Sequence, residues 1–276
     1  MGIVVAASAT GAPGVTTATL GLALTWPRDV VLADCDQAPS QTVLSGYLRG
    51  TEPGGRGLNA LAKAHREQED LRSELPRQLV PLTMEEAPRR DFLPGFTHPG
   101  SALVFHQVWP ELVNAFESLG DEDRDVIVDA GRLGADGLAN ALVSQADVVL
   151  LVVRSTLRSL AATRLYLQGL NDQLTAVPGQ PTVGLLVVGP DRPYSNREIE
   201  RTFSFPVWGD VAFDDCDADV LCEGAVPPRR FADRPLMRSL RAVASSTVSR
   251  LEERERQIVG TGSQRRGGLL AGAHHD

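Results

Sequence analysis

The chain has 276 residues, 42% of them hydrophobic, so it is long enough to bury a substantial core. Its formal net charge of -8 and isoelectric point near 5.2 argue against a surface whose main task is to hold nucleic-acid phosphates. Three cysteines without disulfide or zinc-site spacing indicate a reducing compartment, so we expect a cytoplasmic protein. Because no cleavable leader and no apolar run of about 18 residues is visible, we expect neither secretion nor a membrane span.

Short apolar runs alternate with helix-like segments along most of the chain. The runs that we interpret as strands are 2–7, 29–34, 78–82, 125–130, 147–153, 182–188 and 206–213. The segments that we interpret as helices are 16–25, 103–119, 137–145, 157–175, 196–203 and 236–251, with a further charged helix within 50–77 at the edge of the domain.

Continuous β-branched runs suit strands that are covered on both faces. The alternation therefore predicts a single doubly wound α/β domain, with a mostly parallel sheet of about seven strands and helices on both faces. We place this domain at 1–256. We expect a disordered tail over 257–276, where neither periodicity nor apolar content supports packing.

The segment TGAPGVTT, residues 10–17, follows the first predicted strand and opens the first predicted helix. Glycines in such a turn let backbone N–H groups approach an anion, and the helix N-terminus adds a partial positive charge. Thr16 lies where a hydroxyl can coordinate Mg²⁺, and Thr17 lies where one can contact a phosphate. The pattern predicts a phosphate-binding loop.

This loop resembles that of the ParA/MinD family of deviant Walker A ATPases, which are P-loop NTPases with the motif K-G-G-x-G-K-[ST]-[ST]. Thr10 and Val15 stand at the two lysine positions, and Ala12 stands at the second glycine. The segments LADCDQAPSQ, FLPG, DVIVDAGRLG, ADVVLLVVRSTLRSLAATR and VWGDVAFDD are similar to family motifs in the same order, and the similarity covers about residues 2–250. The cofactor-binding residues that the resemblance implies are Gly11, Ala12, Pro13, Gly14, Val15, Thr16 and Thr17.

The resemblance also assigns roles to three aspartates. Asp34 and Asp36 match the D-x-D motif, which implies catalytic positions that hold Mg²⁺ and the attacking water. Asp129 matches the Walker B aspartate, so the implied metal site consists of Thr16, Asp34 and Asp129. The alternative is that these carboxylates only cap helices or solvate turns.

The family likeness implies a nucleotide-responsive switch protein with ATP and Mg²⁺ as cofactors, a homodimer around ATP, and a protein partner that the sequence does not identify. Relatives position division, partition or pilus and secretion machinery. The uncharged Thr10 and Val15 depart from the family, and losses of such lysines slow phosphoryl transfer by roughly 10²- to 10⁵-fold.

Three outcomes stay open: an active ATPase, nucleotide binding with little hydrolysis, and a scaffold that binds no nucleotide. The candidates for a substitute cation are Arg132, Arg154 and Arg158. Base recognition is open as well, because GPDRP stands where family members often carry an asparagine.

Two further segments carry alternatives. The arginines at 229, 230, 234, 238 and 241 suit either a DNA contact or a solvated helix face balanced by carboxylates, and we favour the second. The acidic run DDCDADVLCEG lacks the glycine of a calcium loop, so we interpret it as a helix start. The tail has few bulky apolar groups, so we expect no stable membrane anchoring.

Overall fold

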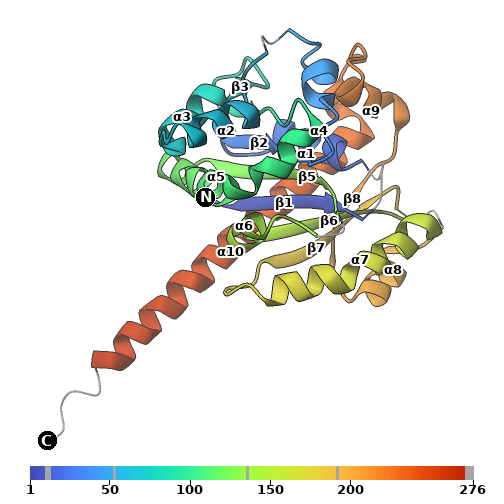
Figure 1. Cartoon of the computed structure of the whole chain (residues 1–276). Helices are drawn as coiled ribbons and strands as arrows, with labels where there is room; N and C mark the ends of the chain where they lie inside the picture. The colour runs from blue at the N-terminus through green and yellow to red at the C-terminus, as the bar shows by residue number, and fades with distance from the viewer. Residues whose placement is uncertain (10–13, 52–53, 135–136, 191–192, 271–276) are drawn as a thin grey trace, which may run out of the picture.

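The computed structural model of the chain describes residues 1–9, 14–51, 54–134, 137–190 and 193–270, with side chains described as far as Gln257. Eight strands form one sheet in the order β3-β4-β2-β5-β1-β6-β7-β8 (Figure 1). All neighbouring pairs are parallel except β3 with β4. The strands are β1 (Ile3–Ser8), β2 (Val30–Asp34), β3 (Val80–Pro81), β4 (Arg90–Leu93), β5 (Asp125–Arg132), β6 (Val148–Arg154), β7 (Thr182–Val188) and β8 (Val207–Val211). The predicted doubly wound, mostly parallel sheet is confirmed.

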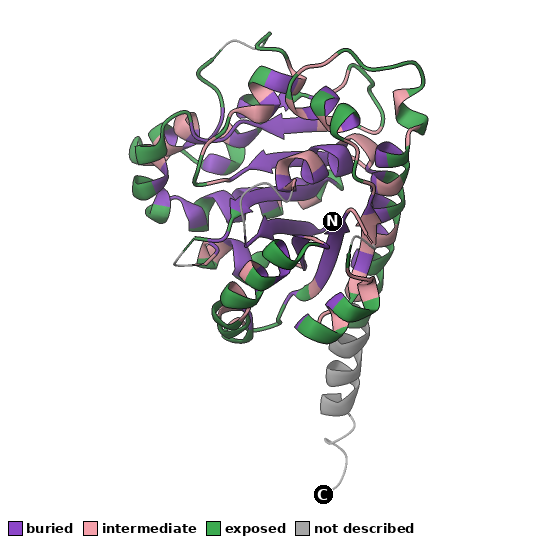
Figure 2. Ribbon diagram, turned by 90° about the vertical axis from the view of Figure 1, so that its right-hand side faces the viewer, coloured by how far each residue is buried: buried purple, intermediate pink, exposed green. Residues whose placement is uncertain are grey.

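Helices cover both faces of this sheet, so that the strands form the buried middle layer (Figure 2). The α-helices are α1 (Val15–Thr25), α2 (Leu58–Arg66), α3 (Leu71–Gln78), α4 (Pro99–Val104), α5 (Trp109–Ser118), α6 (Asn140–Gln145), α7 (Leu157–Thr175), α8 (Asn196–Phe203), α9 (Asp215–Cys222) and α10 (Pro235–Leu270). Short π and 3-10 turns are η1 (Thr42–Tyr47), η2 (Phe105–Gln107), η3 (Leu119–Glu122) and η4 (Phe231–Asp233).

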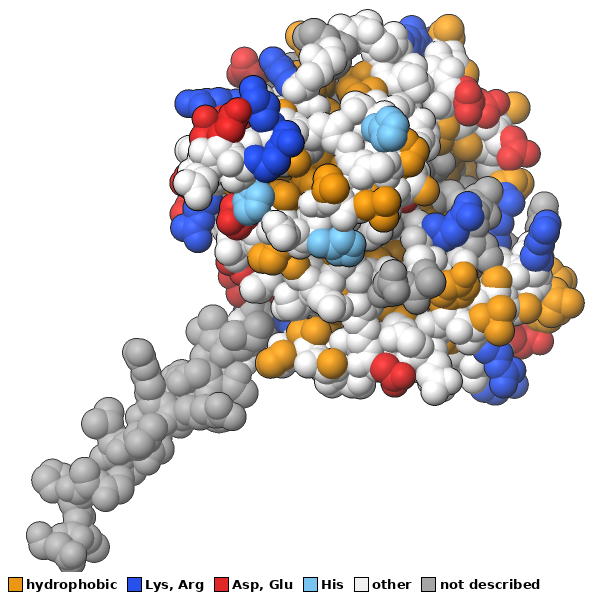
Figure 3. Space-filling view, in the orientation of Figure 1, with side chains coloured by type: hydrophobic (Ala, Val, Ile, Leu, Met, Phe, Trp, Pro, Cys, Tyr) orange, Lys and Arg blue, Asp and Glu red, His pale blue; other side chains and the backbone are white. Residues whose placement is uncertain are grey.

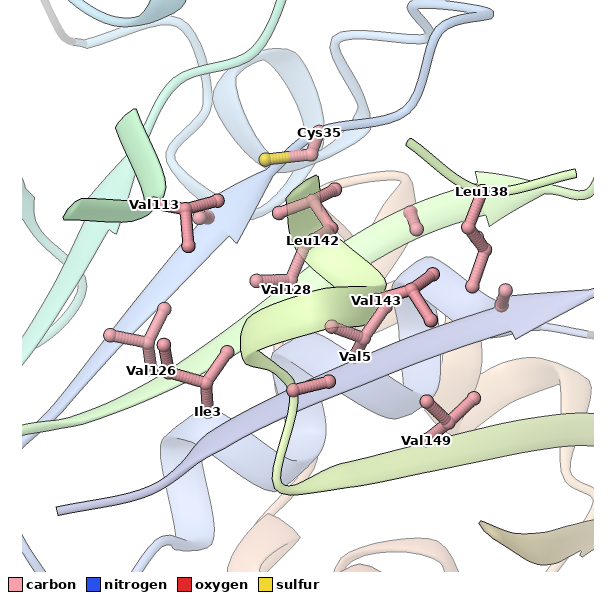
Figure 4. Packing of buried hydrophobic residues seen from close by; sticks show 14 of the residues in the cluster. Ile3, Val5, Cys35, Val113, Val126, Val128, Leu138, Leu142, Val143 and Val149 are labelled. Carbon is pink, nitrogen blue, oxygen red and sulfur yellow. The ribbon is translucent and has the colours of Figure 1, made fainter. Parts of the chain in front are cut away.

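The central strands contribute side chains to two separate apolar layers. Ile3 and Val5 of β1 point into the layer that holds residues of α2, α3, α5, α6, α7 and α8, as Figure 4 shows for part of this layer. Val4 and Ala6, the alternate residues, point into the layer with α1, α9 and α10. Because successive strand residues face opposite ways, a continuous apolar run is what a strand between two helical layers requires.

Several elements differ from the predicted ranges for local reasons. The helix expected over 103–119 is interrupted, and α5 starts anew where Pro110 lies in its first turn, the position that tolerates a missing N–H. The charged segment 50–77 forms two helices, because Asp70 caps α3 by accepting a hydrogen bond from the Arg72 backbone. Strand β4 raises the strand count to eight, since its two large apolar residues are too few for a clear signal.

Helix α10 packs along α1 and β8 and then continues away from the domain (Figure 1). Glycines allow the close approach, since a Cβ at Gly21 would meet Leu240 and one at Gly209 would meet Val243. The backbone is helical to Leu270, and residues 271–276 lie outside the described part. The domain end at 256 and the disordered tail over 257–276 stay predictions. None of the helices in the described ranges combines the length and apolarity needed to cross a membrane.

The charged segments near the C-terminus lie largely at the surface. On the face shown in Figure 3, lysine and arginine side chains stand in separate groups, some of them beside acidic side chains. In the arginine cluster, Arg234 forms ion pairs with Asp214 and Asp217. Asp214 also caps α9, as the interpretation of the acidic run as a helix start predicts. Part of the cluster's charge is therefore balanced by nearby carboxylates.

Candidate functional site

The carboxyl ends of β1, β2 and β5 lie side by side, because these strands are neighbours in the sheet. Asp34 closes β2 and pairs in register with Asp129 of β5. Both side chains are buried, at 8% and 2% exposed. Two aspartates that are 95 positions apart in sequence thus meet at the edge where open α/β sheets bind ligands.

Helix α1 begins directly beside these carboxylates. Gly14 precedes it with φ 85°, a left-handed conformation that glycine adopts without strain, and its carbonyl accepts the first helical bond from the Ala18 N–H at 2.8 Å. In the described part of the chain, Gly14 provides no side-chain cap, and the first turn of α1 holds no acidic residue of its own. The predicted binding residues Gly11, Ala12 and Pro13 lie outside the described residues.

Hydroxyl groups of α1 connect the helix to Asp129. The Thr16 hydroxyl hydrogen-bonds the Asp129 carboxyl, and Thr19 Oγ1 donates to Asp129 Oδ2 at 3.3 Å. The other carboxyl oxygen accepts the Gly131 N–H at 2.9 Å. Thr16 and Asp129 therefore meet as the resemblance implies. Thr19 is an additional partner that the motif does not include, although it lies one turn after Thr16 on the same helix.

Burial is the main influence on the pKa values of Asp34 and Asp129. Loss of solvation raises the pKa of Asp34 to about 8, and the charge of Asp129 adds to that increase. Loss of solvation also raises the pKa of Asp129 to about 6, against the opposing effect of the hydrogen bonds from Thr16, Gly131 and Thr19. Burial therefore favours the protonated form of Asp34 at neutral pH when no cation is present.

Asp36 lies at the same edge in a different environment. Its carboxylate accepts a hydrogen bond from the Ala38 N–H at 2.8 Å, and its own N–H donates to Asp34 Oδ1 at 3.3 Å. Burial raises its pKa, while the positive charge of Arg132 opposes the increase. Gly131 lies beneath this carboxylate with φ 62°, and a Cβ there would collide with it. The three predicted aspartates thus occupy one small region.

The two remaining loop residues, Val15 and Thr17, have different surroundings. Val15 is 6% exposed and belongs to the apolar layer under α1, so its side chain contributes packing and only its backbone N–H is available to a ligand. Thr17 Oγ1 lies 2.9 Å from Cys222 Sγ of α9. The sequence offered no signal for this pair, because its members are 205 positions apart.

Two cavities lie next to this region. One, of about 330 Å³, is bordered by Gly14, Thr17 and Ala18 of the α1 start and by residues after β7 and β8. The second, of about 530 Å³, lies at the ends of β6, β7 and β8 and includes Thr156, Gly189 and Pro190. Both are lined by Arg154, Val188, Ala212 and Phe213. The guanidinium carbon of Arg154 lies 4.1 Å from the centre of the Phe213 ring.

The oxygen atoms at this edge are of the type that Mg²⁺ prefers. Within the described ranges, no group of three or more His, Cys, Asp or Glu side chains is arranged to hold a metal ion. A divalent cation here would therefore use one or two of the carboxylates of Asp34 and Asp129, the Thr16 hydroxyl, and oxygens of water or phosphate. Magnesium sites in phosphate-binding proteins commonly have this mixed composition, so the donor set fits the ion. The positive charge of a bound cation would oppose the effect of burial on the pKa of Asp34 and favour its charged form.

No protein-family model and no curated protein sequence matches the chain. Solved structures do match it. The MinD cell division protein of Aquifex aeolicus has a TM-score of 0.67 and 15% identity, over 90% of this chain and 98% of that chain. A ParA family ATPase from Chlorobium tepidum TLS has a TM-score of 0.66 and 14% identity, over 88% and 98%.

A third match is the septum site-determining protein MinD from Pyrococcus horikoshii OT3, a structure complexed with Mg-ADP. It has a TM-score of 0.64 and 17% identity, over 89% of this chain and 95% of that chain. These identities are low, so the matches concern the path of the backbone rather than the chemistry of the loop. The chain has the MinD/ParA-like P-loop NTPase fold, built on a single mostly parallel sheet of eight strands with helices on both faces.

Proposed function

We propose that the chain is a nucleotide-responsive switch protein that binds ATP with Mg²⁺ at the α1 start and hydrolyses it weakly or not at all. The observation that carries this proposal is the meeting of Asp34, Asp129 and Thr16 at the uncapped N-terminus of α1. The fold supports it, since MinD from P. horikoshii is described in complex with Mg-ADP. A bound Mg²⁺ would draw the phosphates toward these oxygens and neutralise part of their charge.

We expect weak hydrolysis because uncharged residues stand at both lysine positions of the loop. Val15 carries no charge and packs in the apolar layer, and Thr10 is uncharged as well. Without a lysine at either position, the charge that develops on the transferred phosphoryl group has less stabilisation than in the family motif. The backbone N–H groups, the helix end and the cation still attract the ground-state phosphates, so binding is less affected than turnover.

In the cell, the proposed role is the spatial positioning of division, partition or pilus and secretion machinery in the cytoplasm. The neighbours in fold include MinC:MinD of A. aeolicus, a cell division complex, and a ParA family ATPase. We infer a homodimer and a separate protein partner. Leu157 at the start of α7 and Phe213 after β8 are exposed large apolar side chains near the cavities, which supports a protein contact on this side.

A melting curve with and without MgATP tests nucleotide binding. At a free concentration about 100 times Kd, linkage adds about 2.7 kcal/mol of stability, which gives an easily measured rise in Tm. We expect Asp129→Ala to remove most of the rise. The exposed carboxylate variant Asp172→Asn on α7 serves as the control and should keep it. A phosphate-release assay on the same samples should show turnover far below that of lysine-containing relatives.

The second candidate function is a pseudo-ATPase that acts as a protein-interaction scaffold. The burial of Val15 favours it, because that side chain packs in the apolar layer and has no need of a ligand. The absence of any Tm rise with millimolar ATP, ADP or GTP would support the scaffold and overturn the switch.

A further inference from the structure

We infer that Arg154 is the cation that contacts the ligand's phosphates in place of the missing loop lysines. This inference rests on the proposed nucleotide-binding function. The sequence left Arg132, Arg154 and Arg158 as candidates for a substitute cation. Arg154 is distinguished by its position, by a charge that no carboxylate pairs with in the described part of the chain, and by the strength of the contact it can make with a phosphate.

The position of Arg154 is set by the sheet. It is the last residue of β6, which lies next to β1, so it follows the strand beside the one that leads into the loop. Its backbone N–H donates to Ser159 Oγ at 3.0 Å, which fixes the turn into α7. The side chain lines the smaller cavity together with Gly14 and Thr17. Among the described residues that line this cavity, it is the one cationic side chain.

The charge of Arg154 is available to a ligand. No ion pair with a carboxylate is found for it in the described part of the chain. Its side chain lies over the ring of Phe213. Asp214 and Asp215 line the same cavity, but Asp214 already binds Arg234 and the Asp217 N–H. Arg154 is therefore held by an aromatic surface rather than by an opposite charge.

The other two arginines are less suited to the role. Arg132 is exposed, and its charge acts on Asp36. Arg158 is exposed in the first turn of α7 and is not among the described lining residues of either cavity. Neither one borders the α1 start as Arg154 does.

The relative strengths of the two contacts favour movement of the Arg154 guanidinium from the Phe213 ring to a phosphate. An exposed cation–π contact changes an equilibrium constant by a factor of about 2 to 5. A hydrogen bond between a guanidinium and a charged oxygen changes it by a factor of about 10 to 150. A phosphate that enters the smaller cavity would therefore draw the guanidinium away from Phe213. The flexible side chain makes this change without movement of the backbone.

The test measures the affinity of the full chain for MgATP by displacement of a fluorescent ATP analogue. Variants are Arg154→Gln, Arg154→Lys and, as a control, Arg164→Gln, which removes an exposed charge farther along α7. We expect Arg154→Gln to weaken MgATP binding by about tenfold or more, Arg154→Lys to keep part of the affinity, and Arg164→Gln to match the wild type within about twofold. Magnesium tripolyphosphate, which has no base, should displace the analogue from the wild type and do so less well from Arg154→Gln.

Equal MgATP affinity of Arg154→Gln and Arg164→Gln would overturn the assignment while nucleotide binding itself stands. Weakened MgATP binding with unchanged tripolyphosphate competition would overturn it too, because Arg154 would then act on the base. Failure of tripolyphosphate to compete on the wild type counts against phosphate recognition in the same way. If the wild type binds no nucleotide at all, the proposed function falls first and the inference with it.

Discussion

Asp34 and Asp129 lie opposite each other on adjacent parallel strands, and both are buried at the edge of the sheet where α1 begins. Loss of solvation raises both pKa values, to about 8 for Asp34 and to about 6 for Asp129. The charge of Asp129 adds to the increase for Asp34, and the charge of Asp36 adds to the increase for Asp129. In the protein without a cation, this pair is therefore a source of pH-dependent instability rather than a neutral feature of the core.

The first prediction concerns pH. A carboxyl group whose pKa is higher in the folded state binds more proton there, so the free energy of unfolding falls as pH rises between about 4 and about 8. The fall approaches about 1.4 kcal/mol per pH unit for one fully shifted group. We expect Asp34→Asn to flatten this dependence, measured by urea unfolding at several pH values without Mg²⁺ or nucleotide. The exposed variant Asp172→Asn should retain the wild-type slope, and a wild-type stability that is flat from pH 5 to pH 8 would contradict the prediction.

The second prediction concerns the loop lysine. Because Val15 packs in the apolar layer, Val15→Lys should lower the free energy of unfolding by about 2 kcal/mol or more and should not improve MgATP affinity. Val15→Met has a similar length without charge, so the difference between the two variants in urea unfolding isolates the cost of the ammonium group. A lysine variant as stable as the methionine variant and tighter for ATP would show that position 15 faces the ligand.

The third prediction concerns the buried Asp125 at the start of β5. Its carboxylate accepts hydrogen bonds from the Gly2 N–H at 2.7 Å and from Trp26 Nε1 at 2.8 Å, and it pairs with Arg28 at 2.9 Å. Asp125→Ala should cost about 3 kcal/mol or more, since it leaves several polar groups without a partner. Trp26→Phe removes one donor but leaves the carboxylate in place. A loss for Asp125→Ala no larger than for Trp26→Phe in thermal or urea unfolding would show that the cluster is not coupled.

The fourth prediction separates two arginines of the C-terminal cluster. Arg234 pairs with Asp217, which is 1% exposed, whereas Arg229 is exposed. Arg234→Ala should destabilise the chain by about 2 kcal/mol, because it leaves a buried carboxylate unpaired, and Arg229→Ala should change stability by less than about 0.5 kcal/mol. Equal Tm values for the two variants would mean that the charge of Asp217 is satisfied in another way.

The same cluster bears on the nucleic-acid alternative. If DNA is a partner, the double variant Arg229→Ala and Arg230→Ala weakens a salt-dependent affinity that the wild type displays in a titration with duplex DNA. We expect no such salt-dependent binding by the wild type, given the net charge of -8. Binding that is lost in the double variant would refute this expectation.

Sequence pattern alone determined the architecture to a large extent. The β-branched runs at β1, β2, β5, β6 and β7 predicted buried parallel strands, because side-chain alternation and hydrophobicity are local properties of a run. It also placed Asp34, Asp36 and Asp129 at the carboxyl ends of strands and Thr16 at a helix start. The errors of the sequence-based prediction also have local causes. Strand β4 has too few apolar residues to be recognised. Pro110 lies at the start of α5 and divides a helix that hydrophobic spacing had predicted as continuous.

Tertiary structure decided which of these groups interact. The strand order brings Asp34 beside Asp129, and packing of α9 brings Cys222 to Thr17. The stacking of Arg154 on Phe213 and the burial of Val15 likewise depend on how β6, β8 and α1 are assembled. Contacts between residues far apart in sequence, and the loss of solvation that shifts a pKa, arise only once the layers pack, so no local pattern encodes them.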